Sequence, residues 1–145
     1  MGWFNYIGLI VICLILIPNI VFAVKNKDGF ENVYHNKVVE TFEQIGRFGS
    51  FALMIFNIPY TYFGFFFTNG LTVYITVDAL LTFAYIIIWC VCFNKYFKFR
   101  AYALSIIPSI LFIFSGFMIL NIPLLLFSVI FAIFHIMLSV KNVKN

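Results

Sequence analysis

The residues best suited to chemistry in this chain lie in the stretch "NKVVETFEQIGRFGS", residues 36–50. Four of its polar side chains lie at positions i, i+3, i+4 and i+7: Glu40, Glu43, Gln44 and Arg47. This spacing places all four on one face of a helix, with Val, Phe and Ile between them. We expect Glu40, Glu43 and Arg47 to face other helices and to contribute to a site for a small polar solute or an ion.

Three more polar residues interrupt otherwise apolar stretches and are candidate site residues: Asn57, Asp78 and His135. An ionisable group inside a membrane is costly, so it marks a functional site by default. The alternative role for Asp78 is a structural hydrogen bond to Ser115, Asn57 or Thr82. For His135, which should lie at about the depth of Glu40 and Glu43, a hydrogen bond between helices is the more common role.

Depth along the helices predicts a specific partner for Asp78. If the second helix starts at Lys37, Arg47 lies about 15 Å from the inner edge of a hydrocarbon core of about 30 Å. Asp78 lies about 20 Å from the same edge, within reach of a long arginine side chain. We therefore predict that Arg47 pairs with Asp78, and also with Glu43 one turn before it, and so joins the second and third helices.

The composition places these residues in a membrane. Hydrophobic residues make up 64% of the chain and charged residues 10%, against roughly half and a quarter in soluble domains. Five apolar runs approach the roughly 20 residues that cross a bilayer, at about 3–24, 38–59, 71–93, 101–120 and 122–140. They predict an all-α integral membrane protein, a single domain over residues 1–145 with five transmembrane helices. The second span could instead begin at Ile45, with Pro59 as an internal kink.

The basic residues orient the bundle. Lys and Arg occur in the gaps after the first, third and fifth apolar runs and are lacking from the other two gaps. Because such residues favour the cytoplasmic side, we expect an outside N-terminus, a cytoplasmic C-terminus and a multi-pass location in a bacterial plasma membrane. The basic residues form no folded basic face, so no nucleic-acid partner is expected.

A hexapeptide occurs twice, as "MIFNIP" at residues 54–59 and "MILNIP" at 118–123. Asn is a favoured helix N-cap, and Pro is tolerated in a first helical turn. We predict that Asn121 caps the fifth helix, with Pro123 in its first turn. Asn57 would cap a short segment, Ile58–Phe67, whose aromatic part at residues 60–67 lies along the outer interface. A helix-start signal used at two places explains the repeat better than a duplication of part of the chain.

The sequence contains no phosphate-binding Gly-rich loop, no HExxH motif and no nucleophile elbow. Its three cysteines, two of them in a C-x-C pair, match no usual metal-ligand spacing. No metal, cofactor or catalytic residue is therefore expected. We favour a small carrier or channel-like protein, working as a homodimer because five helices form a thin bundle. The alternatives are a non-transporting accessory or immunity-type protein and, less favoured, a lipid-modifying enzyme.

Overall fold

The computed structural model describes residues 4–25, 37–58, 60–64, 68–92 and 98–142. Within these ranges the chain forms five α-helices and no β-strand, so the all-α prediction is confirmed. The helices are α1 (Tyr6–Lys25), α2 (Lys37–Ile55), α3 (Gly70–Cys92), α4 (Lys98–Met118) and α5 (Ile122–Asn142). Trp3, the expected start of the first helix, and most of the loop before α2 lie outside the described residues.

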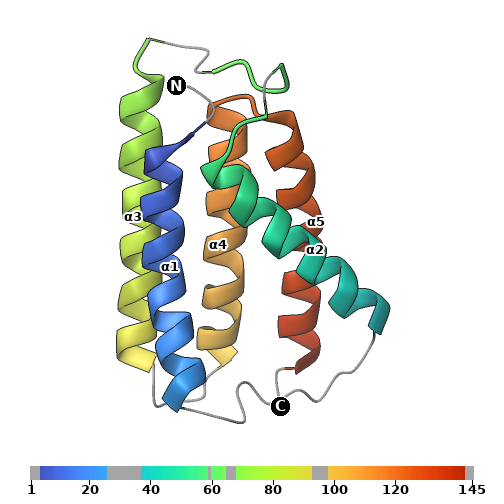
Figure 1. Cartoon of the computed structure of the whole chain (residues 1–145). Helices are drawn as coiled ribbons and strands as arrows, with labels where there is room; N and C mark the ends of the chain where they lie inside the picture. The colour runs from blue at the N-terminus through green and yellow to red at the C-terminus, as the bar shows by residue number, and fades with distance from the viewer. Residues whose placement is uncertain (1–3, 26–36, 59, 65–67, 93–97, 143–145) are drawn as a thin grey trace.

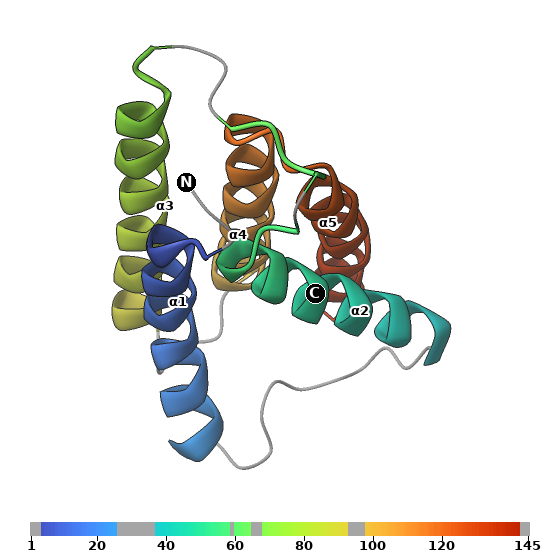
Figure 2. The ribbon, with the colours of Figure 1, turned by 45° about the horizontal axis from the view of Figure 1, so that its top comes forward.

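The five helices form a closed ring in the order α1, α3, α4, α5, α2. Each helix packs against its two neighbours in this order, and α2 makes a minor additional contact with α4. Figures 1 and 2 show that α2 runs obliquely across the other helices, so its beginning lies far from α1 and its end lies beside the start of α1. Within the described residues, the backbones of α2 and α3 do not pack together.

Glycines allow the closest approaches of α2 to its neighbours. A Cβ atom on Gly46 would lie 2.5 Å from the backbone nitrogen of Phe131 on α5. A Cβ on Gly8 of α1 would lie 1.8 Å from the carbonyl oxygen of Met54 on α2. Only residues without a side chain fit such contacts, which are typical of helices that associate through small residues. These glycines therefore set the tilt of α2 relative to α1 and α5.

Asparagines begin two of the helices. Asn121 Oδ1 accepts a hydrogen bond from the backbone N–H of Leu124 at 3.2 Å, so the predicted cap of α5 is confirmed, and Pro123 lies in the first turn. Asn5 caps α1 in the same way, with its Oδ1 accepting from the N–H of Gly8 at 2.9 Å. Its backbone N–H donates to the carbonyl of Ile55, which joins the start of α1 to the end of α2.

The expected role of Asn57 and the expected end of α2 are both wrong. The helix ends at Ile55, and Ile58 together with residues 60–64 forms no helix for Asn57 to cap. Pro59 and residues 65–67 lie outside the described residues. The start of α2 at Lys37 does confirm that the helix begins before Glu40 rather than at Ile45.

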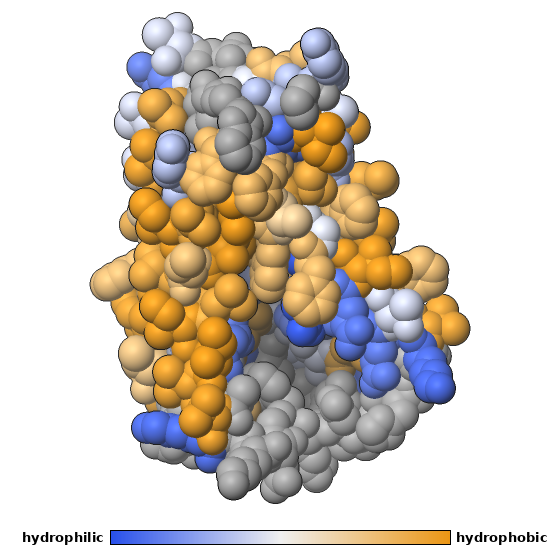
Figure 3. Space-filling view, viewed as in Figure 1, coloured by the Kyte–Doolittle hydropathy of each residue, from blue (hydrophilic) through white to orange (hydrophobic). Residues whose placement is uncertain are grey.

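The outer surface of the bundle is apolar and its interior holds polar side chains. Large hydrophobic residues on every helix are exposed, among them Ile10, Phe48, Leu80, Ile110 and Leu126. Figure 3 shows this apolar surface on one face, with hydrophilic side chains gathered along α2 beside a hollow. Two helices, Gly70–Cys92 and Ile122–Lys141, are long and apolar enough to cross a membrane. The shorter apolar segments are Tyr6–Phe22 and Tyr102–Met118.

Basic residues of four helices lie at one end of the bundle. The lower end in Figure 1 contains the last turns of α1 and α5 and the first turns of α2 and α4. These turns carry Lys25, Lys141, Lys37 and Arg100. The Arg100 side chain is buried and donates to the carbonyl of Cys92 at 3.2 Å. Lys98 begins α4, and the remaining basic residues of the gaps, Lys27, Lys95 and Lys144, lie outside the described residues.

Candidate functional site

The predicted polar face of α2 contributes one fully buried carboxylate to the interior. Glu43 is 2% exposed, and its Oε1 accepts hydrogen bonds from Arg47 Nε at 2.9 Å and from Arg47 Nη2 at 2.6 Å. The two residues are one helical turn apart, so the predicted pairing of Arg47 with Glu43 is confirmed.

His135 of α5 completes this group from the opposite side. Its Nδ1 lies 3.1 Å from the same Glu43 oxygen, which confirms the expectation that the two residues share a depth. An ionised carboxylate only accepts hydrogen bonds, so Nδ1 is the donor in this contact. The imidazole ring stacks on Phe131, with centroids 4.5 Å apart. We call Glu43, Arg47 and His135 the Glu43 cluster.

The Glu43 cluster is open on one side. The side chains of Arg47 and His135 are 39% and 24% exposed, whereas that of Glu43 is 3% exposed. The cluster therefore holds its negative charge inside the protein and presents a guanidinium and an imidazole outward. Such a surface can donate hydrogen bonds to a polar or anionic group and can exchange a proton at the imidazole.

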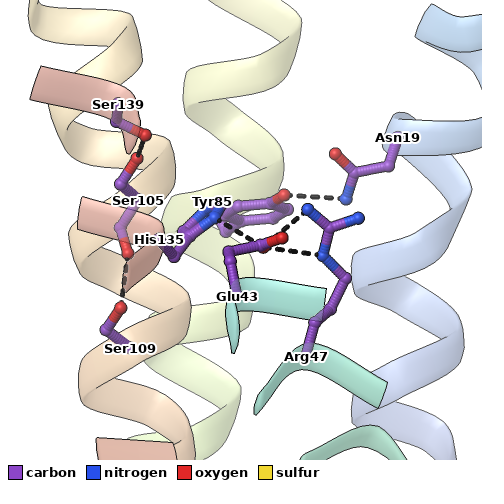
Figure 4. A network of polar contacts seen from close by, with 8 residues as sticks. All are labelled: Asn19, Glu43, Arg47, Tyr85, Ser105, Ser109, His135 and Ser139. Carbon is purple, nitrogen blue, oxygen red and sulfur yellow. Dashed lines mark hydrogen bonds and ion pairs between the residues drawn. The ribbon is translucent and has the colours of Figure 1, made fainter. Parts of the chain in front are cut away.

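A second hydrogen-bonded pair, missed in the sequence, lies beside the Glu43 cluster. Asn19 of α1 donates from Nδ2 to the hydroxyl of Tyr85 on α3 at 2.8 Å and to the carbonyl of Ile15 at 2.9 Å. Figure 4 shows Tyr85 and Asn19 next to the guanidinium of Arg47, which interacts electrostatically with Tyr85. The available signal was a tyrosine in the middle of an apolar run, because a buried hydroxyl usually has a partner.

Glu40 and Gln44 do not join the cluster. Gln44 is exposed and Glu40 is half-buried, although both share the predicted face with Glu43. The oblique path of α2 turns only part of that face toward the interior. The expectation that Glu40 faces other helices is therefore met only in part.

The predicted ion pair between Arg47 and Asp78 is wrong. Asp78 is 1% exposed and its Oδ2 accepts a hydrogen bond from Ser115 of α4 at 2.7 Å. Arg47 is held by Glu43 instead. Arg47 reaches α3 beside Tyr85, which lies seven residues from Asp78, or about 10 Å along the helix, so the predicted depths do not match. The alternative role, a hydrogen bond to Ser115, is the observed one.

The two asparagines of the repeated hexapeptide contact each other. Asn121 Nδ2 donates to Asn57 Oδ1 at 3.2 Å, and both side chains are buried. This bond joins the segment after α2 to the N-cap of α5. Asn57 therefore fixes the end of the bundle opposite the basic residues, at a distance from the Glu43 cluster along α2, and does not belong to the same site.

Neither a metal site nor a matching protein adds to this description. The part of the chain that the structure describes holds no group of three or more His, Cys, Asp or Glu residues able to bind a metal. Comparison of the chain with protein-family models, curated proteins and solved structures finds no match. The function must therefore be inferred from the Glu43 cluster and from the distribution of polarity.

Proposed function

We propose that this chain is a multi-pass membrane protein with five spans that binds a small polar solute or ion at the Glu43 cluster, for transport across the membrane. The observation that carries the proposal is the apolar outside of the helices. Large Ile, Leu, Val and Phe side chains are exposed on every helix, whereas Glu43, Asp78 and several serines are buried beside the apolar core. In water such a surface would cause association, whereas lipid tails solvate it.

The length and exposure of the helices support several spans. In the most apolar stretches of α3 and α5 only 28% and 17% of the residues are buried, whereas the core helix of a soluble protein is mostly buried. The segments of α1 and α4 lie alongside these two helices and expose similar apolar faces.

For α2, contacts with α5 near both ends support a path across the membrane alongside α5. Glu43 contacts His135 near the basic end, and Asn57 contacts the cap of α5 at the other end. A cytoplasmic position for the basic end follows from the preference of Lys and Arg for that side.

The ligand class follows from the donors that the Glu43 cluster exposes. Arg47 and His135 are partly open, and a hollow lies on the face beside α2 (Figure 3). A solute with a hydrogen-bond-accepting or anionic group matches these donors. Its approach would weaken the bonds that Arg47 and His135 make to Glu43, so binding and release would be linked to the state of the ion pair.

A second candidate function is that of an accessory protein that binds another membrane protein. Within the described residues, many polar side chains serve contacts between helices. Ser105 of α4 and Ser139 of α5 form a hydrogen bond (Figure 4), and Ser115 of α4 donates to Asp78 of α3. If the bonds of Glu43 likewise serve only packing, the protein needs no solute.

The two candidates differ in solute binding. Purified protein in proteoliposomes should take up at least one member of a panel of labelled amino acids, small carboxylates and inorganic anions. Glu43→Gln combined with His135→Phe should abolish this uptake, because it removes both the charge and the imidazole. Gln44→Leu changes an exposed residue of the same helix and should leave uptake unchanged. No uptake of any solute by folded wild-type protein would favour the accessory role.

A labelling experiment tests the five spans and their orientation separately. In a variant whose native cysteines are replaced by serine, Asn69→Cys lies just before α3 at the end opposite the basic residues. It should react with an impermeant maleimide added outside cells, and Lys141→Cys should react only after permeabilisation. Labelling of both from outside, or the reverse pattern, would contradict the proposed topology.

A further inference from the structure

Asp78 lies among buried side-chain oxygen atoms that are outside the Glu43 cluster. Asp78 is 1% exposed; Ser115 donates to its Oδ2 at 2.7 Å, and its Oδ1 has no hydrogen-bond partner among the described residues. Thr82, one helical turn further along α3, is 3% exposed, and its Oγ1 also has no partner among these residues. Side chains four residues apart in a helix are neighbours, so Asp78 and Thr82 share one face of α3.

This carboxylate is not neutralised by a basic side chain. None of the ion pairs between described residues involves Asp78, and Arg47 is bonded to Glu43. Burying an unpaired carboxylate costs far more than burying a neutral group, and the cost is several kcal/mol even for a polar group without a partner. A positive charge must therefore accompany Asp78, either a proton on the carboxyl group or a bound cation.

The surrounding oxygens favour a cation over a proton. A proton on Oδ1 adds one donor, which can pair with only one neighbouring oxygen, such as Thr82 Oγ1. A cation beside Oδ1 can be bound by Thr82 Oγ1 and by the Ser115 oxygen as well. The hydroxyl of Tyr74, one turn before Asp78, interacts with both Asp78 and Ser115 and accepts a hydrogen bond from Asn5 at 3.1 Å.

The single negative charge of Asp78 favours a monovalent ion over a divalent one. One carboxylate supplies a single negative charge, whereas sites for divalent cations commonly combine several carboxylates. No cluster of acidic residues occurs around Asp78 within the described part of the chain. We propose that Asp78, Thr82 and Ser115 bind a monovalent cation of the size of sodium between α3 and α4. This site is separate from the Glu43 cluster, and its existence does not depend on the function proposed for that cluster.

Sodium binding should stabilise the folded chain, because the unfolded chain has no such site. Thermal unfolding of purified protein in mild detergent is measured at increasing sodium chloride, with choline chloride keeping the ionic strength constant. The midpoint should rise by about 5 °C between 1 and 100 mM sodium and then level off. Asp78→Asn should remain folded, because its amide oxygen can still accept from Ser115, and should lose the response. Thr82→Val should raise the apparent sodium Kd about tenfold.

Two control variants separate this site from the other carboxylates. Glu40→Gln and Glu43→Gln each remove one negative charge from α2 and should keep the full sodium response. If Asp78→Asn does not fold, the weakened response of Thr82→Val relative to these controls decides the question. A midpoint that changes with pH and not with sodium would show that a proton neutralises Asp78. A sodium response retained in Asp78→Asn would place the ion elsewhere, and either result overturns the proposal.

Discussion

The hydrogen bond between His135 and Glu43 should be measurable as an interaction free energy between the two residues. The perturbations are Glu43→Gln, His135→Phe and the two together. Glutamine keeps the shape of the side chain and removes its charge. Phenylalanine keeps the stacking on Phe131, where the ring centroids are 4.5 Å apart, and removes Nδ1, which lies 3.1 Å from Glu43 Oε1.

The expected magnitude follows from burial and charge. A hydrogen bond to a charged group contributes about 1.5–3 kcal/mol. The side chain of His135 is 24% exposed, so water competes for Nδ1 and we expect about 1 kcal/mol from this bond. Glu43→Gln also weakens two bonds to the half-exposed Arg47, so it should lower the free energy of unfolding by about 2 kcal/mol. The double variant should then cost about 2 kcal/mol rather than the sum of about 3 kcal/mol.

Reversible equilibrium unfolding in mixed detergent micelles provides the assay, with all four proteins measured under one set of conditions. Glu40→Gln is the matched control, since Glu40 lies one turn earlier on α2, is half-buried and makes no ion pair with a described residue. It should change the free energy of unfolding by no more than about 0.5 kcal/mol. Additivity of Glu43→Gln and His135→Phe within about 0.3 kcal/mol would refute the contact, because groups in direct contact are not additive.

Two further predictions concern the packing of the helices and use thermal unfolding. Gly8→Ala should destabilise the protein by about 2 kcal/mol or more, because its Cβ would lie 1.8 Å from the Met54 carbonyl oxygen. Gly116→Ala, whose Cβ would lie 3.1 Å from Leu125 Cγ and 3.2 Å from its backbone nitrogen, should cost less because these contacts are longer, and an equal cost would contradict the packing of α1 on α2. Asn121→Ala should cost about 1–2 kcal/mol by removing the cap of α5. Asn121→Ser should recover part of this loss, and no difference between the two would exclude a capping role.

Local sequence patterns predicted the helices and some contacts of the site. Hydrophobic runs of about 20 residues indicated five helices, since backbone hydrogen bonds in a helix depend only on nearby residues. The contact between Glu43 and Arg47 follows from their spacing, and the cap formed by Asn121 from its place before an apolar run with Pro123. The similar depth of Glu43 and His135 followed from counting residues along each helix.

Other contacts could not be predicted in this way, because they depend on which helices are neighbours. Counting residues gives depth along a helix axis, but it does not give the order of helices around the bundle. This order places Asp78 beside Ser115 and brings Asn19 to Tyr85. The tilt of α2 places Arg47 beside Tyr85 rather than Asp78.

The end of α2 shows the same division between local and tertiary information. Asn57 has the residue type and setting of a helix cap, yet it bonds the side chain of Asn121, 64 residues away. The sequence by itself determined where the helices form, apart from the end of α2, and which face of α2 is polar. The tertiary structure alone decided which helix faces meet, because close approach at Gly8 and Gly46 fixes the oblique path of α2. That path depends on the shapes of three helices at once.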